Sequence, residues 1–167
     1  MGTNWEAVYR ETYADLVRFL HRKVWDADRA HDLAQETFVR ALEHDPQNAR
    51  AFLFTVAGNL ARDEARAAIR RRQHLALIKG EARSRAVEDP GEMLEQRERE
   101  RAVRRALEAL GERDRDVLLL WDAGLSYPEI AAQTGLAVGA VGTTLARARR
   151  RLVESYDQAE GRDAARG

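Results

Sequence analysis

The chain has 167 residues, of which 34% are charged and 7% aromatic, and its 28 basic residues balance its 28 acidic residues. This length accommodates one domain or two small ones, and the zero net charge excludes a uniformly basic coat for nucleic acid. The lack of cysteine excludes disulfides and thiolate metal sites, and no apolar run reaches the roughly 20 residues that span a bilayer, so we expect a cytoplasmic protein without membrane insertion.

The first 72 residues carry the spacing of three helices. Apolar residues recur at steps of three and four over residues 5–20, over residues 28–42, and from residue 49 to the run Arg70-Arg71-Arg72. Asp45-Pro46-Gln47-Asn48 has the chemistry of a turn. No segment alternates with period two for long, so we predict an all-α fold in which residues 1–72 form a small bundle. The residues expected on the inward stripes include Leu42, Phe52, Leu53, Val56, Ala57 and Leu60.

The periodicity is lost over residues 73–91, where Gly80 and Asp89-Pro90-Gly91 indicate a flexible connector. A second helical module is expected over residues 92–157. It begins with mixed charges, which are typical of a solvated helix, and an apolar face starts at Val103. Residues 158–167 are expected to form a frayed tail.

Residues 125–152 have the pattern of a helix-turn-helix. Ser126 can cap a helix, Glu129 completes a capping box, and Gly135 can take the positive φ that turns the chain. The next helix can lie in the major groove of DNA, although ordinary helical hairpins share this pattern. Its expected inward stripe is Val138, Val141, Leu145, Ala148 and Leu152, and its expected outward residues are Gly139, Thr143, Arg147 and Arg150.

A polar ridge is expected along the third helix. Its members are Asn59, Arg62, Asp63, Arg66 and Arg70. Asn and Arg side chains match the hydrogen-bonding groups of base edges and phosphates. A solvated face with internal ion pairs explains the same spacing equally well, so both interpretations stay open here.

Three segments in fixed order resemble bacterial sigma factors. Residues 32–40 are similar to the "DLxQExFxR" segment of that family, residues 52–63 to "WLFxIAxNLxxD", and residues 107–136 to "ALxxLPxRxRxVxxL…GLSYxEIAxxLG". The spacing leaves room for only two modules, which is the arrangement of the extracytoplasmic-function (group IV) sigma factors. The resemblance covers roughly residues 5–156.

The resemblance implies a function and a set of contacts. In this family the first module, region 2, binds the clamp coiled coil of core RNA polymerase and melts the −10 element, while the second, region 4, binds the flap and reads the −35 element. An anti-sigma factor is a further expected partner, and neither a cofactor nor a metal is expected. The implied polymerase contacts are Asp32, Gln35, Glu36 and Arg40. The implied −10 contacts are Asn48 and Arg50, in the loop where the family captures a flipped base, and Asn59, Arg62, Asp63, Arg66 and Arg70. The implied −35 contacts are Ser126, Tyr127, Val138, Gly139, Ala140, Thr143, Thr144, Arg147 and Arg150.

The chain departs from the family pattern at four positions. Phe52 replaces a Trp, and Gly111 replaces a Pro. On the recognition helix, Gly142 stands where the family has Lys, and Thr144 where it has Arg. We therefore expect the −35 element to be read more through shape, backbone and phosphate contacts.

Two other functions compete with this one. A transcription regulator that binds DNA as a dimer without polymerase would use the same helix-turn-helix, but it would not need the segments at residues 32–40 and 52–70. An enzyme is disfavoured, because the four histidines show no ligand spacing and no glycine-rich phosphate loop follows a strand.

Overall fold

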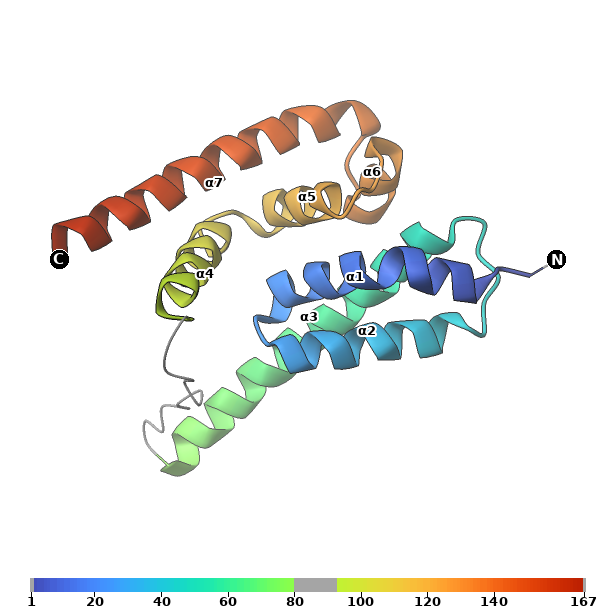
Figure 1. Ribbon diagram of the computed structural model, residues 1–167, viewed down its shortest axis with the longest axis horizontal. Helices are drawn as coiled ribbons and strands as arrows, with labels where there is room; N and C mark the ends of the chain where they lie inside the picture. Colours follow the sequence, from blue (N-terminus) through green and yellow to red (C-terminus); the bar gives the residue numbers. More distant parts are fainter. Residues whose placement is uncertain (1, 80–92, 167) are drawn as a thin grey trace. The chain divides into compact units, whose positions relative to one another are not determined.

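The chain folds into two compact helical units, residues 1–84 and 85–167. The computed structural model describes residues 2–79 and 93–166, and all regular structure in these ranges is α-helical (Figure 1). The all-α prediction of two helical modules is therefore confirmed. None of the helices in the described ranges has the length and apolar character needed to cross a membrane.

The first unit is a three-helix bundle of α1 (Trp5–Val24), α2 (Ala27–Ala41) and α3 (Ala49–Lys79), in which each helix packs on the other two. Side-chain caps define where the first two helices begin: Asn4 accepts a hydrogen bond from the backbone of Ala7, and Asp26 accepts one from Arg29. Trp25 ends α1 in the left-handed conformation (φ 56°) and allows α2 to fold back directly.

The core of the first unit combines large side chains with alanines. Leu16, Leu20, Leu53 and Phe54 are fully buried, and the ring of Phe54 packs edge-on against Phe19. Ala30, Ala34 and Ala57 are also fully buried, and their small size lets the helices approach closely.

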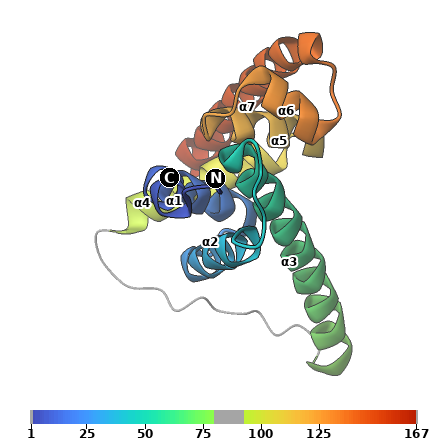
Figure 2. The ribbon, with the colours of Figure 1, turned by 90° about the vertical axis from the view of Figure 1, so that its right-hand side faces the viewer.

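The third helix is longer than the sequence analysis expected. It continues to Lys79, whereas the connector was expected to begin at residue 73. Gln, Leu, Ala and Lys in this stretch are good helix formers, and no Gly or Pro intervenes before Gly80. The apolar spacing fades because residues 71–78 are all exposed, and this end of α3 extends past α1 and α2 (Figure 2). The remainder of the expected connector, residues 80–91, lies outside the described residues.

The second unit contains α4 (Met93–Glu108), α5 (Glu112–Asp122), α6 (Tyr127–Thr134) and α7 (Val138–Arg166). The long helix α7 packs against each of the other three, and α5 packs on α6. The frayed tail expected from residue 158 is helical up to Arg166. Alanine, glutamate and arginine favour helix here, and Gly161 alone costs only about 1 kcal/mol relative to alanine.

Candidate functional site

Both ends of α6 are built as the sequence predicts. The hydroxyl of Ser126 accepts a hydrogen bond from the backbone of Glu129 (3.3 Å), and the Glu129 carboxylate accepts one from the backbone of Ser126 (2.9 Å). Gly135 ends α6 with φ 75°, a conformation that glycine adopts without strain. The buried side chains of Ile130 and Ala131 hold α6 against the rest of the unit. The capping box and the glycine turn are confirmed.

The first turns of α7 expose a different set of side chains from the one expected. Gly139 and Thr143 are exposed, as expected of the outward face, and Ala140 is half-buried. Val138, which was expected in the core, is 51% exposed because it is the first residue of the helix. Thr144, which was expected at the DNA, is only 5% exposed, because it lies next to Leu145 on the packed side of α7. Little of its side chain is therefore accessible for the contact that the sequence implied.

Most arginines in the basic run of α7 contact side chains of α5. The run consists of Arg147, Arg149, Arg150 and Arg151. The buried carboxylate of Asp114 accepts hydrogen bonds from Arg147 (2.9 and 3.4 Å) and from Arg151 (3.5 Å). The Arg149 guanidinium lies 3.7 Å from the ring centroid of Trp121, a cation–π geometry. Within the described residues Arg150 is the one member of this run without a side-chain partner, and it is exposed.

Asp114 is the main residue of this surface that the sequence analysis missed. It sits in the run Arg113-Asp114-Arg115-Asp116, in which the alternating charges do not show which acid turns inward. The structure places it in the first turn of α5, where the hydrogen bond from Arg147 also raises the pKa of that guanidinium above its ordinary value.

The polar ridge on α3 is exposed along its whole length. All five predicted members, from Asn59 to Arg70, are exposed, and none of their side chains makes a hydrogen bond or an ion pair with another described residue. This speaks against the alternative of a face held by internal ion pairs. The ridge therefore offers unengaged amide and guanidinium donors.

The two implied −10 residues ahead of the ridge have structural partners. The side-chain oxygen of Asn48 accepts a hydrogen bond from the backbone of Ala51 (3.0 Å) and so caps α3. Arg50 donates to Asp15 (3.0 Å), and its guanidinium lies 5.3 Å from the ring centroid of Phe54. The contacts of Arg50 join the start of α3 to α1 and to the core, and Asn48 joins the preceding loop to α3.

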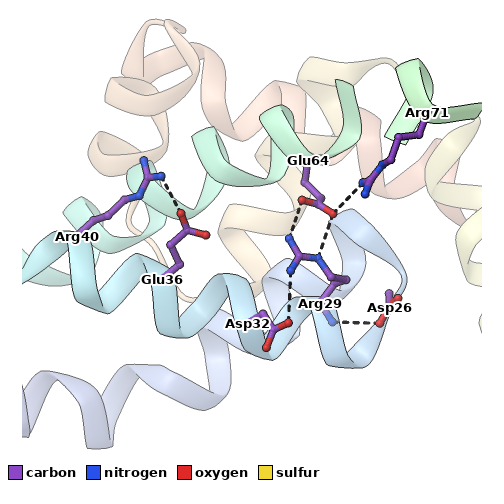
Figure 3. A network of polar contacts seen from close by, with 7 residues as sticks. All are labelled: Asp26, Arg29, Asp32, Glu36, Arg40, Glu64 and Arg71. Carbon is purple, nitrogen blue, oxygen red and sulfur yellow. Dashed lines mark hydrogen bonds and ion pairs between the residues drawn. The ribbon is translucent and has the colours of Figure 1, made fainter. Parts of the chain in front are cut away.

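A network of charges joins α2 to α3 (Figure 3). Arg29 donates to both oxygens of Glu64 (3.0 and 2.7 Å) and to Asp32 (3.4 Å), and Glu64 also pairs with Arg71 (3.6 Å). The hydrogen bond from Arg29 holds the pKa of Glu64 below its usual value. Asp32 is 68% exposed even with this partner, so its carboxylate remains accessible.

The other implied polymerase contacts also lie on the surface of α2. Glu36 pairs with Arg40 at 2.7 Å. The Gln35 amide donates to the hydroxyls of Tyr9 (3.4 Å) and Tyr13 (3.3 Å), which fixes its position against α1.

Two exposed apolar residues adjoin these polar groups. Val39 is 64% exposed and Leu42 57% exposed, although Leu42 was expected on the inward stripe. Leu42 follows the last residue of α2, where the helix is leaving the bundle. Charged and apolar groups together on one helix are typical of a protein interface.

Comparison with known proteins identifies the family. The description "Sigma-70 region 2" matches residues 8–74, and "Sigma-70, region 4" matches residues 100–152. RNA polymerase sigma factor YlaC of Bacillus subtilis is 31% identical over 154 residues, which are 88% of either chain. ECF RNA polymerase sigma factor EcfG of Rhodopseudomonas palustris is 36% identical over 133 residues, 76% of this chain and 71% of EcfG. The chain belongs to the extracytoplasmic-function sigma factors of the sigma-70 family.

Solved structures share the fold of this sigma factor. The sigma factor RpoE of Bartonella quintana, in complex with the anti-sigma factor NepR, aligns with a TM-score of 0.62 at 24% identity and covers 92% of this chain and 97% of that one. CnrH, in complex with the cytosolic domain of CnrY, aligns with the same TM-score at 25% identity over 92% and 88% of the two chains. The matches to both sigma-70 regions and to YlaC and EcfG favour the sigma factor over the polymerase-independent regulator.

Proposed function

We propose that this sigma factor directs core RNA polymerase to its promoters by dividing the work among three surfaces. The first is α2, for the polymerase; the second is the ridge of α3, for the −10 element; the third is the helix-turn-helix, for the −35 element. The observation that carries the proposal is the ridge, because its donors are exposed and unengaged on a segment that matches region 2.

The ridge suits the −10 element because its side chains can bind both the phosphates of a separated strand and the edges of its bases. Arg62, Arg66 and Arg70 can neutralise phosphates, and Asn59 can form paired hydrogen bonds with an adenine edge. Strand opening exposes bases that such groups can then hold. Extruding a base costs a few kcal/mol, so a start of α3 that is already fixed by Asn48 and Arg50 lowers the entropy lost on capture.

The α2 surface supports the proposed contact with the clamp of the polymerase. Asp32 and Glu36 supply accessible carboxylates one turn apart, and Val39 and Leu42 supply apolar area that a partner can cover. The polymerase supplies the chemistry of RNA synthesis, and this chain supplies recognition without catalysis. It acts in the cytoplasm, where promoter DNA and polymerase meet.

An anti-sigma factor is a proposed partner as well. RpoE was solved with the anti-sigma factor NepR and CnrH with the cytosolic domain of CnrY, and the fold of this chain is similar to both over most of its length. A protein that covers the exposed part of α2 would block polymerase binding directly.

Run-off transcription from a genomic promoter library, with core polymerase present or absent, tests the function. We expect transcripts that start downstream of a shared pair of elements, only when both the chain and core polymerase are added. Binding of the same sites without polymerase, with no dependent transcript, would instead identify the DNA-binding regulator.

Two matched pairs of variants test the assigned surfaces. Asp32→Lys combined with Glu36→Lys should weaken polymerase binding by more than about 1 kcal/mol, whereas Glu11→Lys, an exposed reversal on α1, should leave it unchanged. Arg62→Ala should reduce transcription from a panel of promoters with different −10 elements, whereas Arg72→Ala, which changes an exposed arginine of α3 outside the ridge, should have a smaller effect. Equal effects within either pair would reject that surface.

A further inference from the structure

The outward side of α7 is a single line of residues with little chemistry of its own. Gly139, Thr143, Ala146 and Arg150 follow one another at steps of four, three and four, and all four are exposed. The buried side chains of α7 lie on the opposite side of the helix. The first three members, Gly139, Thr143 and Ala146, face the base edges when the N-terminal part of α7 lies in the major groove, and Arg150, one turn further on, lies where phosphates run.

The first nine residues of α7, 138–146, contain no charged side chain. Their only polar side chains are the hydroxyls of Thr143 and Thr144, and Thr144 is buried. The usual base contacts in the major groove come from Arg or Lys to guanine, Asn or Gln to adenine, and acids to cytosine. None of these groups is present in this stretch, and Arg147, which follows it, is bound to Asp114.

Packing does not explain the two glycines among residues 138–146. A Cβ added at Gly139 would meet nothing within 4 Å, and one at Gly142 would only touch the ring of Tyr127 at 3.5 Å. Gly142, which lies inside the helix, nevertheless costs about 1 kcal/mol relative to alanine. Small residues leave the backbone of α7 free to approach the floor of a groove.

From these observations, and resting on the proposed function, we infer that α7 reads the −35 element chiefly through the 5-methyl groups of thymines. The methyl groups of Thr143 and Ala146 are the contacting groups, and Gly139 allows the close approach. The thymine methyl is the one apolar feature of the major groove, and Ala and the Thr methyl are side chains suited to it. Burial of one methyl corresponds to a factor of about four in affinity.

Deoxyuridine in place of thymidine removes only this methyl and so isolates the interaction. A promoter recovered from the transcription library is made with each −35 thymine replaced in turn, and binding of the sigma–polymerase holoenzyme is measured by competition. We expect about a fourfold loss at two or more −35 positions and no loss for replacements in the spacer. Thr143→Ser, which keeps the hydroxyl, should lose the thymine preference at one position, and Thr143→Val, which keeps the methyl, should retain it.

Two results would overturn the inference. One is an unchanged affinity for every deoxyuridine duplex. The other is a preference that survives in Thr143→Ser and disappears in Thr143→Val, because the hydroxyl would then be the reading group. Thr143 is exposed, so neither variant disturbs the core. Failure of the proposed function is a separate outcome, because no promoter would then emerge from the library.

Discussion

Replacing Arg150 should change the salt dependence of promoter binding more than replacing Arg147, although both are exposed arginines of α7. The guanidinium of Arg147 is held by Asp114 at 2.9 Å, so its charge is already partly balanced within the protein. Arg150 has no partner among the described residues. A phosphate contact by Arg150 therefore displaces a counterion of the DNA without breaking an ion pair first.

The size of the effect follows from counterion release. Each neutralised phosphate contributes about 0.9 to the slope of log affinity against log salt, so a fourfold rise in salt, from about 50 to 200 mM, costs a factor of about 3.5 per contact. We expect Arg150→Ala to remove one such factor and Arg147→Ala to remove clearly less. The assay is holoenzyme binding to one promoter at four or more salt concentrations. An equal or larger change of slope for Arg147→Ala would refute the assignment.

Three further predictions concern stability and are tested by urea denaturation of the full chain. Gly111→Pro should stabilise the second unit by about 0.4–1 kcal/mol, because φ is −60° at this residue and suits proline; Gly111→Ala should give a smaller gain. Gly142→Ala should stabilise α7 by about 1 kcal/mol, and a loss would mean that Tyr127 cannot accept the methyl at 3.5 Å. The Glu64 ion pair should contribute less than about 1 kcal/mol, because Arg29 is 42% exposed. Since the pKa of Glu64 is lowered by folding, this contribution should be present above its unfolded value of about 4.3 and be lost as the pH falls through the folded value; Glu64→Gln should lack this pH dependence.

Local signals in the sequence were sufficient to predict the turn chemistry and most helix positions. The capping box of Ser126 and the glycine turn at Gly135 depend on residues within one turn of each other, so nothing distant can override them. The break before α3 and the start of that helix at Ala49 have the same origin. The exposure of the α3 ridge was predicted from spacing alone, because a helix with one apolar side must expose the other.

The sequence predicted the exposure of some side chains wrongly where that exposure depends on distant packing. Val138 and Leu42 have the spacing of core residues, but each stands at a helix end and is more than half exposed. Thr144 was expected to be exposed on the basis of a family pattern, whereas packing next to Leu145 buries it. The pairing of Asp114 with Arg147 joins residues 33 positions apart, and no periodicity in the sequence encodes it.

The outward residues at the start of α7, Gly139, Thr143 and Ala146, offer few groups that can bond to bases. Under the proposed function this is compatible with specific initiation, because both units of the chain bind promoter DNA. A site that binds alone with a millimolar dissociation constant is poorly occupied in solution. When the other unit is already bound, the local concentration of the second is itself about millimolar, so a weak contact becomes substantially occupied. The −35 contact can then rely on small side chains and on Arg150, which has no side-chain partner among the described residues. Under this arrangement most of the hydrogen-bonding discrimination falls to the ridge of α3, where the amide and guanidinium donors are concentrated.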